Sequence, residues 1–155
     1  MIRLFILFSI LALPAHALSC IRPDAVRLFE TARESPDPYV VILGRLRPAG
    51  PITLPEPRKK EVTRMTVRID GKGLSRRGFD VPVSRDVVLE MRCLAEWCPG
   101  FPGKDEAIMA LKVEGKTRVL TVDACGGNLV PWSEDQEKRL LDCATGGRCM
   151  TLDGF

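Results

Sequence analysis

Residues 107–122 read AIMALKVEGKTRVLTV and contain the clearest strand signal in this sequence. Ala107 to Val113 is an apolar run of the length of one buried strand, and Arg118 to Val122 is a second such run. Glu114-Gly115-Lys116 separates the two runs and supplies the glycine that a tight turn favours. The stretch therefore predicts two consecutive strands joined by a turn, and the rest of the architecture is built outward from this pair.

Three further strands are predicted upstream of this pair. Tyr39 to Leu46 and Val87 to Met91 are rich in β-branched and apolar residues, and apolar residues alternate from Val62 to Ile69, where Asp70-Gly71 predicts a turn. Residues 48–58 contain four prolines and residues 99–104 read PGFPGK, so both segments are expected to be loops. Residues 71–85 receive no clear assignment. Five strands joined by turns predict a small closed or partly open barrel.

A short helix is expected on each side of the strands. Asp24 is a capping residue for an apolar face that runs to Ala32, and the turn at 35–38 ends this first helix. Ser133 and Gln136 have the spacing of a capping box, so a second helix is expected to begin there. We expect Trp132 to be a core aromatic. Turn and cap roles are expected for Asn128, Pro131 and Ser133.

The N-terminal residues 1–17 have the three parts of a cleavable export signal. Arg3 gives the positive start, Leu4 to Leu13 is an apolar run, and Ala15-His16-Ala17 is a small-x-small cleavage site. The run is about half of the ~20 residues that span a bilayer, so we expect a secreted or periplasmic protein without a transmembrane anchor. A lipid anchor on Cys20 is the less favoured alternative, because Leu18 stands directly before Ser19. Residues 18–155 are expected to form a single domain.

Histidine content restricts the chemistry of the mature chain. The only His in the 155 residues is His16, so removing residues 1–17 leaves 138 residues without one. Neither a Ser-His-Asp nor a Cys-His mechanism is then available, and no His can ligate a metal. Catalysis by carboxylates alone remains as an alternative, a carboxylate-dependent hydrolase. The adjacent acids Asp105-Glu106 and Glu134-Asp135 point differently on a strand or helix, so we expect no enzyme and no cofactor.

Six cysteines remain in the mature chain, which is an even number. Export into an oxidising compartment makes structural disulfides the expected state, and six Cys allow 15 pairings among which the spacing does not choose. The alternative is a zinc site built from Cys93, Cys98, Cys143 and Cys149. Their intervals of four and five intervening residues are longer than structural zinc sites usually have, so no metal is expected.

In the C-terminal part, Cys125 is followed by Val130, Pro131 and Trp132, and then by a helix that opens with Ser133 and Gln136. This motif resembles that of the netrin-like family, which includes the tissue inhibitors of metalloproteinases (TIMPs). The strand pair at 107–121 precedes this Cys as it does in the family. The resemblance implies a mainly β fold, a five-stranded OB-like barrel of netrin/TIMP type with a short N-terminal helix and a C-terminal helix, tied by disulfides. By analogy Cys20 pairs with Cys125; proximity in sequence suggests Cys93 with Cys98 and Cys143 with Cys149.

The same resemblance implies an exported, non-catalytic binding module that contacts a protein partner. In the inhibitors, the α-amino group and carbonyl of an N-terminal Cys chelate the catalytic zinc of a metalloprotease. Here Leu18 stands in the place of that Cys, so no disulfide would hold the chelating residue rigid, and another protein or glycan contact is favoured over protease inhibition. The partner-contacting residues implied at the N-terminus are Leu18, Ser19 and Cys20.

Positive charge is concentrated in residues 45–92, which hold 12 Lys and Arg against 6 Asp and Glu. The densest clusters are Arg58, Lys59 and Lys60, and Arg76 with Arg77. Binding of an anionic polymer or glycan is therefore an alternative function, with solvated loop charges as the simpler explanation. Nucleic acid is disfavoured, because single-strand binding relies on stacked aromatics and this region contains only Phe79.

Overall fold

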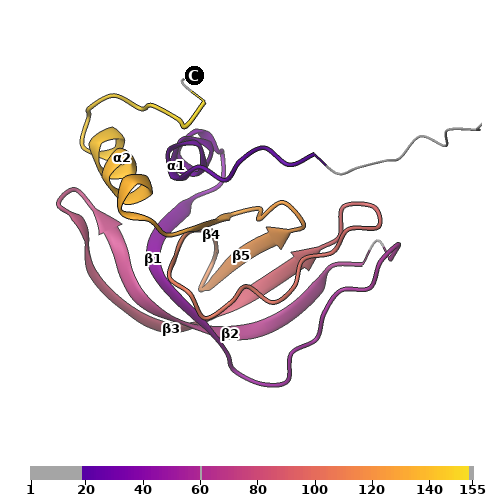
Figure 1. Ribbon diagram of the computed structural model, residues 1–155. Helices are drawn as coiled ribbons and strands as arrows, with labels where there is room; N and C mark the ends of the chain where they lie inside the picture. Colours follow the sequence, from indigo (N-terminus) through magenta and orange to yellow (C-terminus); the bar gives the residue numbers. More distant parts are fainter. Residues whose placement is uncertain (1–18, 60, 154–155) are drawn as a thin grey trace, which may run out of the picture.

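The computed structural model describes residues 19–59 and 61–153, in which two helices accompany six strands (Figure 1). The helices are α1 (Ala25–Glu34) and α2 (Glu134–Ala144). The strands are β1 (Tyr39–Pro48), β2 (Thr63–Ser75), β3 (Gly78–Arg92), β4 (Ala107–Glu114), β5 (Thr117–Asp123) and β6 (Leu129–Pro131). The signal peptide predicted over residues 1–17, together with Leu18 and Lys60, lies outside the described residues.

Five of the strands close into a barrel in the order β1-β2-β3-β5-β4, and β4 returns to β1. Closure is achieved by β1, whose residues 39–44 pair with β4 while residues 42–48 pair with β2. β3 and β5 run parallel from Val88↔Val119 to Arg92↔Asp123, and the other pairs are antiparallel. The predicted mainly β, OB-like barrel flanked by two helices is confirmed. The short β6, which the sequence did not predict, pairs with β4 from Ala107↔Pro131 to Met109↔Leu129.

The turn predicted at Asp70-Gly71 is wrong, because β2 continues through these residues to Ser75. Gly71 lies opposite Gly44 where β1 crosses β2. A Cβ on Gly44 would lie 2.5 Å from the carbonyl oxygen of Asp70, and one on Gly71 would meet the backbone of Leu43 and Gly44. The glycine at position 71 therefore serves a close approach of two backbones inside the barrel, not a change of direction.

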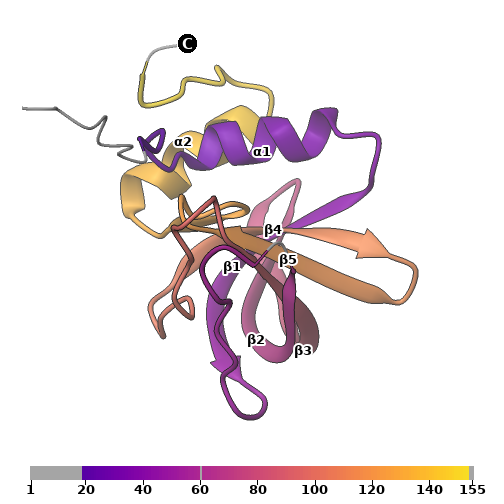
Figure 2. The same ribbon diagram turned by 90° about the vertical axis from the view of Figure 1, so that its right-hand side faces the viewer.

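Two apolar clusters meet on β4. Met109 and Leu111 face the barrel interior, whereas Ile108 and Ala110 pack with Leu140 of α2 and with residues of α1. Figure 2 shows both helices side by side across the barrel, and the two helices contact each other. Because β4 is covered on both faces from Ala107 to Leu111, this part of its sequence is a continuous apolar run without alternation. Within the described ranges, neither helix has the length and apolar content needed to cross a bilayer.

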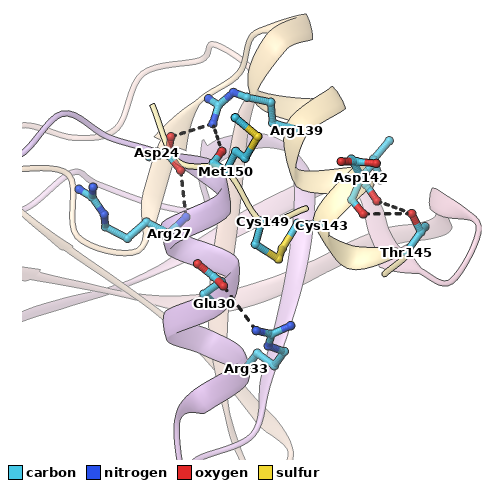
Figure 3. The surroundings of a disulfide bond; sticks show 11 residues. Asp24, Arg27, Glu30, Arg33, Arg139, Asp142, Cys143, Thr145, Cys149 and Met150 are labelled. Carbon is cyan, nitrogen blue, oxygen red and sulfur yellow. Dashed lines mark hydrogen bonds and ion pairs between the residues drawn. A yellow bond between two sulfur atoms is a disulfide. The ribbon is translucent and has the colours of Figure 1, made fainter. Parts of the chain in front are cut away.

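Three disulfides join the elements, and their pairs are those expected from the resemblance and from proximity. Cys20 is bonded to Cys125 across a sequence separation of 105, which ties the N-terminal segment to the loop between β5 and β6. The pair Cys93–Cys98 closes a short loop after β3. The pair Cys143–Cys149 folds the C-terminal tail back on the end of α2 (Figure 3). All six cysteines lie in the described ranges and none is free.

A buried carboxylate holds the start of α1 against α2 and the C-terminal tail (Figure 3). The Asp24 side chain, 1% exposed, accepts hydrogen bonds from the Arg27 and Leu152 backbone N–H groups and from Arg139 Nη1 at 2.8–2.9 Å. Burial on its own would raise the pKa of Asp24, but these donors outweigh it and hold the pKa below its ordinary value. Asp24 is thus both the N-cap predicted from the sequence and a link between both ends of the described chain.

Candidate functional site

The end of the β2–β3 hairpin lies against α2 and forms one side of a basic cleft. Ser75 pairs with Gly78 across a two-residue turn, and the Ser75 hydroxyl accepts a hydrogen bond from the Arg77 backbone N–H at 3.0 Å. Gly78 has a φ of +115°, and a Cβ there would lie 3.7 Å from the Leu141 side chain of α2. The turn of the hairpin therefore lies beside α2 (Figure 1), and Arg76 and Arg77 line the space between them.

The cleft between the hairpin turn and α2 has a volume of about 620 Å³. Its charged lining is Arg76 and Arg77 from the hairpin, Asp135, Lys138, Arg139 and Asp142 from α2, and Arg148 from the tail. Five cations therefore face two carboxylates, which gives the cleft a net positive charge. Leu141 and the 51% exposed Met150 contribute apolar side chains, and Gly78 and Thr145 complete the lining.

Some of these cations are already neutralised by neighbouring carboxylates. Arg77 Nε lies 2.8 Å from Asp80, and Arg139 contacts both Asp24 and Asp135 at 2.9 Å. The hydrogen bond from Ser75, followed by the charge of Arg77, holds the pKa of Asp80 below its ordinary value. By contrast, none of the ion pairs within the described ranges involves Arg76, Lys138 or Arg148. These three side chains are the cations that the cleft offers to a ligand.

The other predicted basic cluster lies elsewhere. Arg58 and Lys59 belong to the loop before β2, at the opposite end of that strand from Arg76 (Figure 1). Arg58 forms an ion pair with Glu96 at 2.9 Å, and Lys59 forms one with Glu56 at 2.9 Å that raises the pKa of Lys59. Lys60 lies outside the described residues. The structure thus separates the two clusters into different surfaces.

The residues that carry the resemblance, at 130–136, are mainly structural. Val130 is buried, Pro131 ends β6, and the Ser133 hydroxyl caps α2 by accepting from the Gln136 N–H. Gln136 does not complete the expected capping box. Its Oε1 accepts from the Ala25 N–H at 2.8 Å and its Nε2 donates to the Pro23 carbonyl at 3.0 Å, so it caps α1 instead.

The prediction that Trp132 is a core aromatic is wrong. The side chain is 42% exposed, and its Nε1 donates a hydrogen bond to Glu137 Oε2 at 2.8 Å. Pairing of β6 with β4 leaves Trp132 just beyond the strand end, where its backbone N–H donates to the Glu106 carbonyl at the barrel surface. Its indole therefore covers the start of α2 and takes no part in the core.

The predicted N-terminal contact residues lie at the surface where the structure describes them, and the cysteines are all in disulfides. Ser19 and Cys20 are exposed, with Cys20 fixed to Cys125, while Leu18 lies outside the described residues. The alternative zinc site is excluded, because all four of its cysteines are in disulfides. Glu30 approaches the Cys143–Cys149 sulfurs, but a disulfide offers no thiolate to a metal.

Lys138 and Arg148 were not predicted as site residues. The sequence does place Lys138 on a charged helix face. Charged residues at the three- and four-residue spacing of one face are Asp135, Lys138, Arg139 and Asp142. That pattern alone is typical of any solvated helix face, and only the packing of the hairpin against α2 assigns it to a cleft. Comparison with protein-family models, curated proteins and solved structures found no match.

Proposed function

We propose that the protein is an exported, non-catalytic binding module that holds an acidic segment of a partner protein in the basic cleft. The observation that carries this proposal is the convergence of Arg76, Lys138 and Arg148 from three separate parts of the chain, none of them in an ion pair with another described residue. Like charges brought together without partners repel each other, and an anionic ligand removes that repulsion.

The apolar part of the lining favours a protein over a simple polyanion. Met150 is half exposed beside the cations and Leu141 lies in the same cleft. Protein interfaces combine an apolar centre that includes Met with a polar, Arg-rich surround. A sulfated or carboxylated polymer would engage the charges and leave the methionine without a counterpart.

Three carboxyl groups of the described residues are held in ion pairs. The pKa values of Asp24, Asp80 and Glu90 each lie below their ordinary values. Burial would raise the pKa of Glu90, but hydrogen bonds from Arg92 and Arg64 outweigh it. A carboxylic general acid needs a raised pKa, so these three groups are suited to ion pairs.

Export is the other part of the proposal. Three disulfides fit a protein that matures in an oxidising compartment, and the predicted signal would give a mature chain that begins at Leu18. Intact mass spectrometry of the exported protein tests this start. A mass that retains residues 1–17, or one that carries a lipid on Cys20, would contradict it.

The cleft is tested with two charge-reversal variants of equal net charge. R76E/K138E/R148E alters the three unpaired cations of the cleft, and K72E/K104E/K116E alters three exposed lysines elsewhere that also form no ion pair in the described ranges. The probe is a synthetic peptide of alternating Asp, Glu and Leu, and its dissociation constant is measured at physiological salt. Since an exposed pair contributes about 0.2–1 kcal/mol, three pairs give about 1.5 kcal/mol, so we expect a loss of roughly tenfold or more in the cleft variant alone.

Equal loss in both variants would show attraction by net charge only and would contradict the cleft. Heparin retention separates the two partner classes. If the cleft variant loses heparin retention while the wild-type protein fails to bind the peptide, the partner is an anionic polymer and the proposed protein partner is wrong.

Metalloprotease inhibition is the second candidate, in line with the resemblance to the TIMPs. The observation that favours it is the Cys20–Cys125 disulfide, which anchors the exposed segment at residues 19–23 to the barrel. Fixing a binding segment in advance lowers the entropy cost of association. Assays of the mature protein against purified metalloproteases test this candidate, and absence of inhibition at high concentration would remove it.

A further inference from the structure

A second concave surface lies on the other side of the hairpin and is distinct from the basic cleft. β3 pairs with β5 only from Val88 to Arg92, so among the described strands β2 alone pairs with residues 79–87 of β3. This part of the hairpin leaves the barrel and curves toward α2 (Figure 1). A groove of about 760 Å³ opens between it and the beginning of β1, which is within the usual size of small-molecule sites.

The walls of the groove are mostly apolar. Val40 and Ile42 line it from the barrel side of β1, and Phe29 of α1 lies at the helix side. The hairpin contributes Leu74, Val81 and Val83, and Val81 is 48% exposed. The groove therefore joins the edges of both hydrophobic clusters, and it exposes apolar surface that a bound apolar chain would cover.

Addition of a peptide strand to this edge is disfavoured. Pro82 lies in the middle of the β3 segment that lacks a second neighbour, opposite Lys72 of β2. Proline supplies no N–H to a strand ladder, and proline and lysine are residues that protect exposed edges from pairing. The ligand of the groove must therefore be recognised by side chains.

Two arginines stand at one end of this groove. Arg85 of β3 and Arg118 of β5 both line it. Arg118 directly precedes Val119, whose pair with Val88 is the first of the parallel β3–β5 ladder. Arg85 lies two residues before Val87 and so projects from the same face of β3.

These arginines have no carboxylate partner among the ion pairs of the described residues. Arg118 is half-buried, and its Nη1 donates to the carbonyls of Gly115 at 3.2 Å and Thr117 at 3.0 Å. Its other guanidinium N–H groups, like those of Arg85, remain available to an acceptor. The arrangement is an apolar trough with two guanidinium groups at one end, and guanidinium groups bind carboxylates and phosphates well.

We propose that this groove binds a single-chain anionic amphiphile, a long-chain carboxylate whose head group lies between Arg85 and Arg118. The acyl chain runs along Val83, Val81 and Leu74 toward Phe29. Both parts of the ligand are needed: the chain covers the exposed apolar wall, and the head group supplies the charge that complements the two arginines. This site is independent of the acidic protein segment proposed for the basic cleft.

The test compares dodecanoate with dodecanol, which have the same chain and differ in head-group charge. Dissociation constants are measured by displacement of a fluorescent fatty-acid probe from the disulfide-intact protein, below the micelle concentration. We expect R85Q/R118Q to weaken dodecanoate binding by roughly tenfold or more and to leave dodecanol within about twofold. V81E places a carboxylate in the trough and should weaken both ligands, dodecanoate more strongly.

The control is K72Q/K104Q, which removes the same charge outside the groove lining and should change neither constant. Circular dichroism and melting temperature establish that each variant is folded. The proposal is overturned if wild-type protein binds neither compound, if it binds dodecanol as well as dodecanoate, or if R85Q/R118Q matches the control. The dissociation constant of dodecyl phosphate is measured in the same way to decide between head groups. Tighter binding of dodecyl phosphate than of dodecanoate would overturn the assignment to a carboxylate.

Discussion

Substitution of Asp24 should destabilise the protein far more than a surface carboxylate would. Asp24→Asn keeps an oxygen that can cap α1 through the Arg27 N–H. Its amide group, however, then faces Arg139 Nη1 and the Leu152 N–H, which are both donors and both bond to Asp24 Oδ2 in the native protein. The substitution therefore removes the acceptor of the Leu152 N–H and one of the two acceptors of Arg139 Nη1, at a site that is 1% exposed.

The magnitude follows from these two donors. An unsatisfied buried donor costs about 1–3 kcal/mol. The cost for Arg139 is at the lower end of this range, because Arg139 retains Asp135 and the Met150 carbonyl as partners. We therefore expect the free energy of unfolding to fall by about 2–4 kcal/mol in total. Asp24→Ala also removes the helix cap and should cost about 1 kcal/mol more. Asp135→Asn is the matched control, because it removes the exposed partner of the same arginine and should cost under about 1 kcal/mol.

The assay is urea unfolding of the oxidised protein, followed by far-ultraviolet circular dichroism. The pKa of Asp24 is lowered in the folded state, so the stability it contributes is fully present above its unfolded value of about 3.9 and is lost as the pH falls through the folded value. The difference between wild type and Asp24→Asn should be constant between about pH 5 and 7 and should shrink below about pH 4. A loss at pH 7 no larger than that of Asp135→Asn would refute the reasoning.

Three further predictions concern stability and use the same unfolding assay. Gly71→Ala should lower the free energy of unfolding by about 2 kcal/mol or more, because the new Cβ meets backbone atoms. Gly100→Ala is the control, since open space surrounds Gly100, and it should change this free energy by no more than about 0.5 kcal/mol. Equal effects of the two substitutions would contradict the close crossing of β1 and β2. Gln136→Ala should cost about 2 kcal/mol and Ser133→Ala about 1 kcal/mol, and the reverse order would show that Gln136 does not cap α1. Replacing Cys20 and Cys125 with Ser should cost about 2–4 kcal/mol, and an unchanged stability would show that this disulfide does not constrain the chain.

Strands with a strong local signal could be predicted from the sequence. The pair at 107–122 was assigned correctly because β4 is apolar on both faces and a glycine marks the turn to β5. The start of each helix was also predictable, since Asp24 and Ser133 both accept the hydrogen bonds that define an N-cap.

The distal half of the β2–β3 hairpin could not be predicted because two of its residues give misleading signals. Asp70-Gly71 has the composition of a turn, yet Gly71 is required by the crossing with Gly44, which lies 27 positions away in sequence. Pro82 argues against a central strand, and β3 tolerates it only because this segment has no second neighbour. The first signal misleads because of a contact with Gly44, and the second because part of β3 is unpaired on one side. Both features depend on how the barrel closes and cannot be read from the local sequence.

The candidate site was predictable only in part for the same reason. Arg76 and Arg77 are adjacent in sequence and were found by charge density. Lys138 joins them because Gly78 lies against Leu141 of α2, and Arg148 joins them from the tail that the Cys143–Cys149 disulfide ties to that helix. Conversely, Arg58 and Lys59 had the higher density but are neutralised by Glu96 and Glu56. Local charge density therefore indicates where cations are, and ion pairing in the fold determines which of them remain available.

Both proposed sites depend on the register of a single hairpin. Its turn supplies Arg76 to the cleft, and alternate residues of β3, Val81, Val83 and Arg85, supply one wall of the groove. A shift of one residue would reverse every side chain of a strand between its two faces. The crossing of Gly44 and Gly71 fixes the register of β2 against β1, because a Cβ on either residue would meet backbone atoms. The two-residue turn between Ser75 and Gly78 then sets the register of β3 against β2. The glycine pair and the hairpin turn together therefore position both binding surfaces, although neither glycine of the pair has a side chain that could take part in binding.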